Sequence, residues 1–445
     1  MMDQPTLLRE LERCDRRMTA LVEDLDDRQL DVPYQPGINP PVWELGHTAF
    51  FFEFFLLRRL HGVKPLMPGF DPVWDSFDIP HRERWTPGVV PDKATTMDYY
   101  RRVIDRTLDH FASGDGPGRE GRYLGQYVIA HLCMHIESQI WCRQTLGYPP
   151  PSFAGADQGS PLNPPPPPAD PGGGGSAATD DAEVPAGRWF IGMPGARPAW
   201  EAAEFSFDNE RPGFELDLPA FRISRTLVSN LEFLGFVEDG GYDRPELWSF
   251  GGRYWRRARS LAHPQYWRRP ASGRGWEQRR FDQWQPLDPA APVMHVSFWE
   301  AEAYCRWAGR RLPTEFEWEV AARGDTNAPL PWRPDSVPGG DEAPADLGAR
   351  CLGSAPVTAF ADGAGPFGCL QMIGSVWEWT SSQYLPFDGF CVDMYAYMST
   401  LQFGDHKTTR GGSGATEASL IRSTYRQAYH PDRCDVFTGF RTCAL

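Results

Sequence analysis

The chain is organised around one stretch, Tyr127-Val-Ile-Ala-His131-Leu-Cys-Met-His135-Ile-Glu137-Ser-Gln-Ile-Trp141. Two histidines four residues apart lie on one face of a helix, one turn or ~6 Å apart along its axis. That spacing suits two ligands of one metal ion, although two histidines that simply face a core have it too. A third histidine is needed to favour a metal site. Glu137 can orient a ligand or a metal-bound water, with a surface salt bridge as the alternative.

The composition indicates a globular protein of two or three domains, because 445 residues exceed one ordinary core. Hydrophobic residues make up 41% of the chain and charged residues 23%, which is ordinary for a globular protein. The net charge of −15 and the lack of any Lys/Arg run argue against nucleic acid as a partner. The 17 tryptophans predict aromatic-lined pockets or a loop-rich fold held by large side chains.

The sequence predicts a cytoplasmic location. The first ten residues lack the basic and apolar regions of a secretory signal. No apolar run reaches the length of about 18 residues that a membrane span needs, so no membrane partner is expected. Nine cysteines without close pairing in the sequence are typical of free thiols in a reducing compartment.

Residues 1–147 are predicted to form a bundle of helices. Helical periodicity runs through four segments, at residues 6–27, 39–61, 95–112 and 119–146. Thr6 is the expected N-cap of the first segment, and Gly147 is a natural stop after the last. The loop at residues 62–94 is rich in proline, and loops of this length inside a compact domain are usually functional.

His47 lies in the second predicted helix, just before the phenylalanine-rich residues 50–57. An imidazole without a partner would be poorly satisfied in such surroundings. Helical bundles build metal sites from side chains on facing helices. We therefore predict a site of three imidazoles, from His47, His131 and His135.

Cys133 lies between the two histidines in sequence but about 200° round the helix from each, so we expect it in the core. His295 has no partner at the spacing of metal ligands and is predicted to be structural.

A linker is predicted at residues 148–183. It contains five consecutive prolines, Pro164 to Pro168, and four consecutive glycines, Gly172 to Gly175. A tract of this composition cannot form a core. The expected domains are therefore residues 1–147 and residues 184–445.

The second domain has short apolar runs separated by Gly, Pro and Trp. Strands are predicted at residues 190–193, 205–207, 221–224 and 293–296. Helices are predicted at residues 229–237 and 297–307, the latter with a capping box formed by Ser297 and Glu300. A further helix is expected after Thr314, with Glu317 at the matching position.

Several motifs give this second domain a specific resemblance. They are Arg311-Leu-Pro-Thr-Glu-Phe-Glu-Trp-Glu-Val-Ala-Ala-Arg323, Met372-Ile-Gly-Ser-Val-Trp-Glu-Trp-Thr380, Arg410-Gly-Gly-Ser413 and Gly439-Phe-Arg441. Together they resemble the fold of formylglycine-generating enzymes, an irregular α+β fold related to C-type lectins. The cysteine pair that holds copper in those enzymes has no convincing equivalent here, which argues against formylglycine chemistry.

Residues 1–147 resemble a DinB-like four-helix bundle, a family whose metal is held by three histidines on two helices. The expected fold class is therefore α+β, with an N-terminal DinB-like four-helix bundle and a C-terminal formylglycine-generating-enzyme/C-type-lectin-like domain. Over nearly the whole chain, this combination is similar to the non-heme iron sulfoxide synthases of ergothioneine and ovothiol biosynthesis and their selenoneine-forming relatives. The resemblance implies that His47, His131 and His135 bind Fe(2+).

Three imidazoles leave half of an octahedral iron open, with room for O2, a sulfur or selenium donor and an imidazole substrate. The resemblance implies that the acceptor substrate is hercynine, the trimethylated betaine of histidine, and that a bond forms at its imidazole C2. The trimethylammonium group has no N–H to donate, so an aromatic face or weak oxygen contacts would hold it.

A tyrosine is the usual proton or electron donor beside the iron in this family. Its position follows the Trp-Glu-Trp motif and matches Tyr395 in Phe390-Cys-Val-Asp-Met-Tyr-Ala-Tyr397. Tyr397 and Tyr384 remain alternatives. The alternative for Tyr395 is that it only packs against its neighbours and takes no part in catalysis.

The donor-binding loop departs from the pattern of ergothioneine enzymes that use γ-glutamylcysteine. Those enzymes carry an Arg-His-Pro-Arg-like loop that pairs with substrate carboxylates, work for which arginine is suited. Here the loop reads Asp75-Ser-Phe-Asp-Ile-Pro-His-Arg-Glu-Arg-Trp85, with Glu between the arginines. Arg82 and Arg84 are candidate substrate-binding residues, and a solvated loop is the alternative.

A motif near the carboxyl end, at residues 425–431, also departs from the pattern of the γ-glutamylcysteine enzymes. It reads Tyr425-Arg-Gln-Ala-Tyr-His-Pro431, where the γ-glutamylcysteine enzymes have an Arg-Asn-Trp-Asp-like sequence. Gln427 and Tyr429 offer an amide, a hydroxyl and a ring in place of a carboxylate, which suits a neutral polyol. This pattern resembles the selenoneine synthase branch, whose donor is a selenosugar.

Three alternatives remain open at this point. The first is an ergothioneine-type sulfoxide synthase that uses cysteine or γ-glutamylcysteine. The second is a non-catalytic module that captures a small ligand. The third is a zinc-dependent thiol transferase, as in DinB-like bacillithiol or mycothiol transferases.

Overall fold

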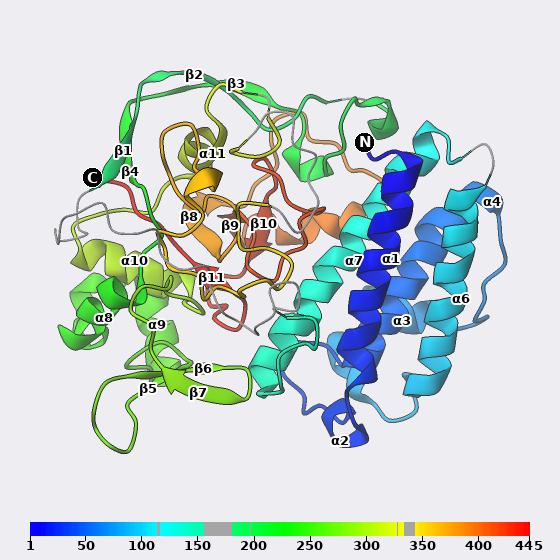
Figure 1. Cartoon of the computed structure of the whole chain (residues 1–445), viewed down its shortest axis with the longest axis horizontal. Coiled ribbons are helices and arrows are strands. Elements are labelled where there is room, and N and C mark those ends of the chain that lie inside the picture. The colour runs from blue at the N-terminus through cyan, green and yellow to red at the C-terminus, as the bar shows by residue number, and fades with distance from the viewer. Residues whose placement is uncertain (114–115, 155–179, 196, 327, 333–342) are drawn as a thin grey trace. The chain divides into compact units, whose positions relative to one another are not determined.

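The computed structural model describes residues 1–113, 116–154, 180–195, 197–326, 328–332 and 343–445 (Figure 1). The described chain forms two compact units. The first contains residues 1–153 and a later segment, residues 197–205. The second contains the remaining described residues. Most of the predicted linker, residues 155–179, lies outside the described residues.

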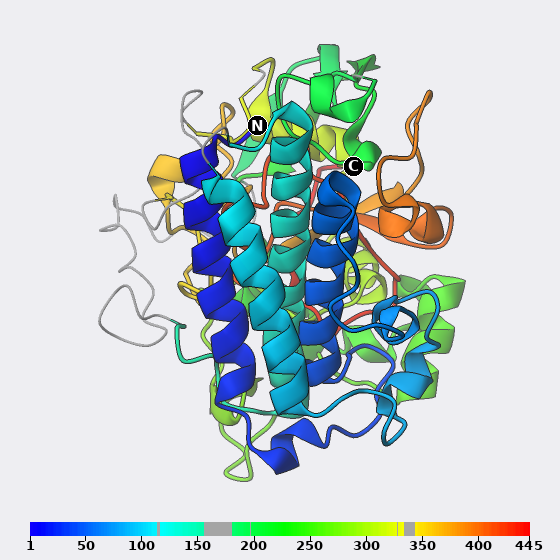
Figure 2. The ribbon, with the colours of Figure 1, turned by 90° about the vertical axis from the view of Figure 1, so that its right-hand side faces the viewer.

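The first unit has four long helices among its described residues, and Figure 2 shows them side by side. They are α1 (Gln4–Glu23), α3 (Pro41–Phe52), α6 (Lys93–Ala112) and α7 (Arg119–Leu146). The shorter helical turns are α2 (Asp27–Leu30), α4 (Arg59–His61), α5 (Asp71–Trp74) and the 3-10 turn His81–Trp85. The predicted helical segments are confirmed, with shifted ends.

Capping residues explain where these helices begin and end. Asp3 caps α1, because its side chain accepts a hydrogen bond from the Thr6 backbone N–H at 3.0 Å. The prediction that Thr6 is the N-cap was therefore wrong by one helical turn. Gly147 ends α7 in the left-handed conformation, with a φ of 70°, as predicted.

A π turn interrupts the second predicted helix. It spans Glu53–Arg58, between α3 and α4. Glu53 is fully buried there and accepts hydrogen bonds at 2.6 Å from the Tyr99 hydroxyl and from the Leu66 N–H. The phenylalanine-rich residues 50–57 thus contain a buried carboxylate that attaches the start of the long loop to the bundle.

The core of the bundle follows helical spacing. α1 buries Leu7, Leu11, Cys14, Met18, Leu21 and Val22. Cys133 on α7 is fully buried, as predicted, and its Sγ lies 3.5 Å from the Sγ of Cys14. Both thiols therefore behave as core side chains.

The segment at residues 197–205 returns to the first unit, although the sequence analysis assigns it to the second domain. Arg119 at the start of α7 donates to the carbonyl oxygens of Trp200 (2.7 Å) and Glu201 (2.8 Å). These contacts fix the segment at the N-terminal end of α7.

The described part of the second unit contains short strands and short helices. Its strands are β1 (Asp181–Val184), β2 (Gly187–Ile191), β3 (Phe214–Leu218), β4 (Phe221–Ser224), β5 (Trp267–Arg268), β6 (Glu277–Arg280), β7 (Gln283–Pro286), β8 (Trp377–Gln383), β9 (Lys407–Arg410), β10 (Gln427–Tyr429) and β11 (Thr438–Gly439). The largest described sheet has the order β10-β9-β8-β11, in which β11 runs parallel to β8. The pairs β1–β4 and β2–β3 and the sheet β5-β6-β7 are antiparallel.

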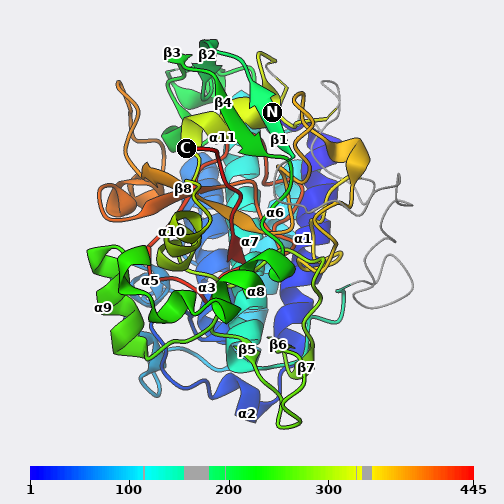
Figure 3. The same cartoon turned by 90° about the vertical axis from the view of Figure 1, so that its left-hand side faces the viewer.

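The described helices of this unit are α8 (Asn230–Glu238), α9 (Phe250–Arg259), α10 (Phe298–Trp307) and α11 (Glu315–Arg323). α8, α10 and α11 begin at capping boxes, whereas the side chain of Ser249 makes no capping hydrogen bond at the start of α9. α10 contacts α8 and α9, and Figure 3 shows the three together. The predicted capping box of Ser297 with Glu300 is confirmed, and so is that of Thr314 with Glu317.

Two of the predicted strands are wrong. Residues 205–207 and 293–296 have no strand geometry. Phe207 instead precedes a 3-10 turn, and His295 has a φ of 62°, which breaks an extended run. The strand at residues 221–224 is confirmed as β4, and the run at 190–193 partly overlaps β2.

Buried pairs of arginine and glutamate hold the loops of the second unit together. They are Arg441–Glu378 at 2.7 Å, Arg410–Glu319 at 2.5 Å, Arg426–Glu315 at 2.7 Å, and Arg422–Glu210. The first two pairs join the motifs that resemble formylglycine-generating enzymes. Loss of one partner leaves a buried charge unpaired, which typically costs about 3–5 kcal/mol. These motif residues therefore support the fold.

We expect His295 to make the stability of the second unit depend on pH. Burial lowers the pKa of His295 to about 3, although its Nδ1 lies 2.9 Å from the Val436 carbonyl oxygen. In the unfolded chain the pKa is about 6.5, so between pH 6.5 and 3 the unfolded state alone binds the proton. The free energy of unfolding should fall as pH falls, by about 1.4 kcal/mol per pH unit for this group.

The comparison variant is His295→Asn, because Asn tolerates a positive φ. Urea unfolding between pH 6 and 4 should show a wild-type-minus-variant difference that falls with that slope. Parallel curves would show that His295 does not titrate as its burial implies.

Candidate metal centre

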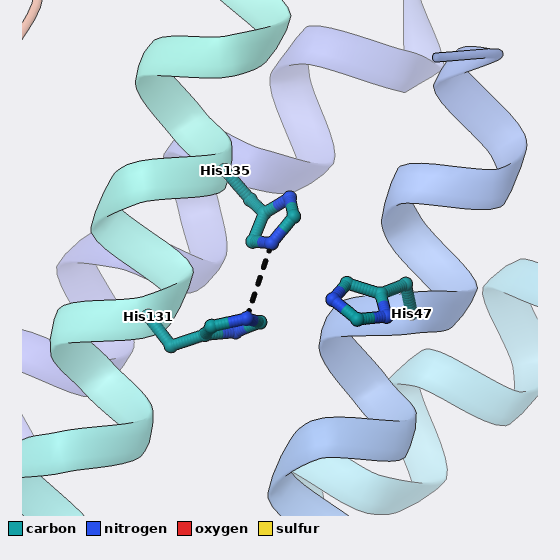
Figure 4. Close-up of side chains that lie close together, drawn as sticks. All are labelled: His47, His131 and His135. Atoms are coloured by element: carbon teal, nitrogen blue, oxygen red, sulfur yellow. Dashed lines mark hydrogen bonds between the residues drawn. The ribbon is translucent and has the colours of Figure 1, made fainter. Parts of the chain in front are cut away.

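Three imidazoles converge in the first unit, as the sequence predicts (Figure 4). His47 comes from α3, and His131 and His135 come from α7. Their candidate ligand nitrogens all lie within 4.8 Å of one another. His47 and His131 are buried, and His135 is half-buried. This group could hold a metal ion.

The helical spacing of His131 and His135 brings their Nε2 atoms 3.2 Å apart. His131 lies flat against the Phe51 ring, with 3.6 Å between ring centroids and 7° between planes. Its Nδ1 is buried and has no hydrogen-bond partner among the described residues. Buried polar atoms are normally satisfied, so this unpartnered Nδ1 is not typical of an imidazole that only packs in a core.

His47 is oriented from both sides by tryptophan residues. Its Nδ1 lies 2.7 Å from the carbonyl oxygen of Trp74, to which it can donate a proton. Its ring stacks on Trp43, with 4.8 Å between centroids and 12° between planes. An Nδ1–H that donates to a carbonyl leaves the Nε2 lone pair for a metal ion.

Burial keeps the imidazoles in the form that binds metals. Burial, with a further contribution from the charge of His135, lowers the pKa of His47 to about 3 and that of His131 well below its usual value. Both rings are therefore neutral at physiological pH. A neutral imidazole is the form that acts as a metal ligand.

Glu44 is a residue of this centre that the sequence analysis missed. Its Oε2 contacts Nδ1 of His135, and it is almost fully buried. Burial alone would raise the pKa of Glu44, but the charge of His135 and hydrogen bonds from His135 and Asn39 outweigh it and hold the pKa at about 2. The signal in the sequence is its spacing, because Glu44 lies three residues before His47 and shares its helical face.

Glu137 is buried on α7. Its predicted role in orienting a ligand or a water stays a prediction, whereas Glu44 is a carboxylate in direct contact with His135.

Arg82 and Arg84 have different surroundings. Arg84 is buried and donates a hydrogen bond to Oδ1 of Asn39 at 2.7 Å, and its guanidinium lies 3.8 Å from the ring centroid of Trp43. Arg82 is exposed, with its guanidinium 4.9 Å from the ring centroid of Tyr34. Their predicted contact with substrate stays a prediction.

The other predicted site residues belong to the second unit. Tyr395 is half-buried and precedes a 3-10 turn. The loop around it is fastened on both sides, because Arg211 pairs with Asp393 at 2.7 Å and Ser399 donates to Asp208 at 2.6 Å. Tyr395 is therefore presented by a loop with fixed ends.

The alternatives to Tyr395 differ in burial. Tyr384 is almost fully buried, with the guanidinium of Arg426 4.9 Å from its ring centroid, and burial raises its pKa. Tyr397 is exposed, with 5.9 Å between its ring centroid and that of Tyr395. These surroundings favour Tyr395 or Tyr397 over Tyr384 as a group that reaches a substrate.

Gln427 and Tyr429 begin and end strand β10. Gln427 is half-buried. Tyr429 is buried, and its ring centroid lies 6.4 Å from those of Trp377 and Trp379. The predicted role of these two residues in reading a donor substrate stays a prediction.

Comparison with known proteins defines the class of this protein. Residues 10–140 match the DinB superfamily, and residues 177–444 match the sulfatase-modifying factor enzyme 1-like domain. The predicted fold class, a DinB-like helical bundle followed by a formylglycine-generating-enzyme-like α+β domain, is confirmed.

Full-length relatives identify the family. The chain is 35% identical to the hercynine oxygenase of Mycolicibacterium smegmatis over 99% of both chains, and 36% identical to that of Mycobacterium tuberculosis over 96% of both. A formylglycine-generating enzyme of Thermomonospora curvata is 32% identical, but the match covers only 54% of this chain and 87% of the relative. The chain therefore belongs to the hercynine oxygenase family.

No helix in the described ranges is both long enough and apolar enough to cross a membrane.

We expect Gly46→Ala to disturb the metal centre without touching a histidine. A Cβ at Gly46 would overlap the ring of Trp74, whose carbonyl oxygen orients His47. The displaced backbone should lower stability by about 1–3 kcal/mol and weaken binding of a divalent metal. Urea unfolding and titration with Co(II) would measure the two effects.

Gly235→Ala in α8 is the matched control. A Cβ there would meet its nearest neighbour, Trp307, at an ordinary 3.5 Å. This variant should bind Co(II) as the wild type does. If Gly46→Ala also binds normally, the Trp74 carbonyl does not orient His47 for metal binding.

Proposed function

We propose that this protein is an O2-dependent non-heme Fe(II) enzyme that acts on hercynine and forms a C–Se bond at its imidazole C2 with a selenosugar donor. The observation that carries the proposal is the convergence of three imidazoles in a chain whose full-length relatives are named hercynine oxygenases. The burial of His47 and His131, which keeps them neutral, supports binding of a divalent metal there.

His47, His131 and His135 would hold the iron through imidazole nitrogens. Bound there, ferrous iron would supply the redox chemistry that activates O2 and would leave open positions for substrates. Zinc also accepts imidazole ligands, so metal analysis of the purified protein separates this proposal from a thiol transferase.

Tyr395 and Glu137 would have separate roles in the reaction. Tyr395 would donate a proton or an electron close to the reacting imidazole, and its fastened loop supports such a role. Glu137 would orient a ligand or a water from its buried position on α7.

The reaction balances as an oxidation by O2. A C–H bond of hercynine and an Se–H bond of the donor are replaced by one C–Se bond. The two hydrogens leave as water with one oxygen atom, and the second oxygen atom stays on selenium. With a thiol donor the same balance gives a sulfoxide.

The surroundings of the candidate donor residues favour a neutral sugar over a zwitterionic thiol. Gln427 and Tyr429 carry no charge, so neither pairs with a substrate ammonium. Arg84 is already engaged by Asn39 and Trp43, which makes it a poor clamp for a substrate carboxylate. Arg82 is exposed, and this observation keeps an ergothioneine-type enzyme with cysteine or γ-glutamylcysteine as the second candidate.

Reconstitution with Fe(II) under anaerobic conditions, followed by hercynine and O2, tests the proposal. The donor is either 1-seleno-N-acetylglucosamine or a cysteine-type thiol, and product mass is read. We expect O2-dependent coupling with the selenosugar. The triple variant with alanine at His47, His131 and His135 should bind no iron and form no product.

Other outcomes correct the proposal at defined points. Coupling with thiols alone would overturn the donor and leave the metal centre and hercynine in place. A protein that contains zinc and consumes no O2 would favour thiol transfer, and one with no metal and no turnover would favour a binding module.

We expect Tyr395→Phe to lower the rate of product formation by about 10²–10⁴-fold, because the ring stays and the exchangeable proton is lost. Iron content, measured on the same sample, should be unchanged. Tyr397→Phe is the comparison, and a larger loss in that variant would move the role to Tyr397.

A further inference from the structure

A hydrogen-bonded chain leads from His135 to the loop at residues 62–94. Its first step joins Nδ1 of His135 to Oε2 of Glu44. With Nδ1 engaged in this way, the Nε2 lone pair is the one directed at the centre, and it lies 3.2 Å from Nε2 of His131. A carboxylate on the outer nitrogen fixes the tautomer and the orientation of a ligand imidazole and makes it a stronger base.

Glu44 is held firmly enough to do this. Its other oxygen, Oε1, accepts hydrogen bonds from the side-chain amide of Asn39 at 2.7 Å and from the hydroxyl of Ser138 at 3.0 Å. Glu44 lies on α3, whereas His135 and Ser138 lie on α7. The carboxylate therefore joins the two helices that carry the three imidazoles.

Asn39 links Glu44 to the loop at residues 62–94 by hydrogen bonds. Its Oδ1 accepts a hydrogen bond from Arg84 at 2.7 Å, and Arg84 also donates to the carbonyl oxygen of Ser76 at 3.0 Å. The buried positive charge of Arg84 thus lies one amide away from the buried negative charge of Glu44. Each charge makes the burial of the other less costly.

Arg84 also reaches the opposite side of the centre. Its guanidinium lies 3.8 Å from the ring centroid of Trp43, and the same ring stacks on His47, with 4.8 Å between ring centroids. A single arginine therefore supports His135 through Asn39 and Glu44, and supports His47 through Trp43. This double connection distinguishes Arg84 from Arg82, whose guanidinium lies over Tyr34.

We propose that Glu44 is a positioning residue that aligns His135 for metal binding, and that Arg84, acting through Asn39, holds Glu44 in place. The inference rests on the proposed metal function of the three imidazoles. It makes Arg84 part of the support of the metal centre, and leaves Arg82 as the arginine of this loop that is open to a substrate.

The test is the affinity of the full-length protein for Co(II), measured by competition with a chromophoric chelator. We expect Glu44→Gln to lower this affinity by about 10–100-fold and to shift the visible absorption bands of bound Co(II), since the amide keeps the shape but removes the charge. The matched control is Glu53→Gln, another fully buried carboxylate, whose described polar contacts are to Tyr99, Leu66 and Arg58 and to none of the three imidazoles. It should lower stability and leave Co(II) affinity and spectrum unchanged.

A second pair of variants tests the outer step, and does so even if Glu44→Gln does not fold. Arg84→Lys keeps the charge but cannot fork between Asn39 and Ser76, so Co(II) affinity should fall severalfold. Arg82→Lys, two residues away, should leave it unchanged.

The outcomes separate this inference from the proposed function. If the wild type binds Co(II) tightly and both Glu44→Gln and Arg84→Lys bind it within twofold of the wild type, the positioning role is overturned and the metal centre stands. If the wild type binds neither Co(II) nor Fe(II), the proposed metal function is overturned and this inference with it.

Discussion

Burial of the imidazoles of His47 and His131 away from water is the constraint on which the centre of the first unit depends. In water an imidazole titrates close to physiological pH, whereas in the bundle burial lowers the pKa of His47 and His131 far below it. The same burial would penalise the charge of Glu44 if His135 and Asn39 did not stabilise it. The neutral rings of His47 and His131 and the compensated carboxylate of Glu44 together form a group that suits the proposed divalent metal ion.

The long loop of the first unit is attached at three points to α3 and to the residues just before and after it. Its start is fastened where the Leu66 N–H donates to Glu53, its middle where the Trp74 carbonyl oxygen accepts from His47, and its end where Arg84 reaches Asn39. A loop with this many prolines and so few helical turns gains order from such contacts. Its fastening explains how a segment with little regular structure can take part in a site that needs fixed geometry.

The sequence predicted those features that depend on local spacing. The i, i+4 pair of His131 and His135, the stop at Gly147 and the capping boxes of the second unit are all set by neighbours within one helical turn. Glu44 was missed because its partner, His135, lies on another helix. The contact between Trp74 and His47 was missed because it is made by a backbone carbonyl, which every residue type has. Short apolar runs such as residues 205–207 failed as strands, because pairing partners far along the chain decide whether such a run becomes a strand.

The π turn at Glu53–Arg58 changes the phase of the helix that contains it. Before the turn, Glu44, His47 and Phe51 lie on one face of α3 and contact His131 or His135 on α7. Glu53 is the first residue of the turn and meets Tyr99, and Leu56 and Leu57 are the buried residues that follow it in the turn. The number of residues in this turn therefore decides which side chains after it face the bundle. Deletion of one residue here would rotate the following residues about the helix axis and bring different side chains against α6 and α7.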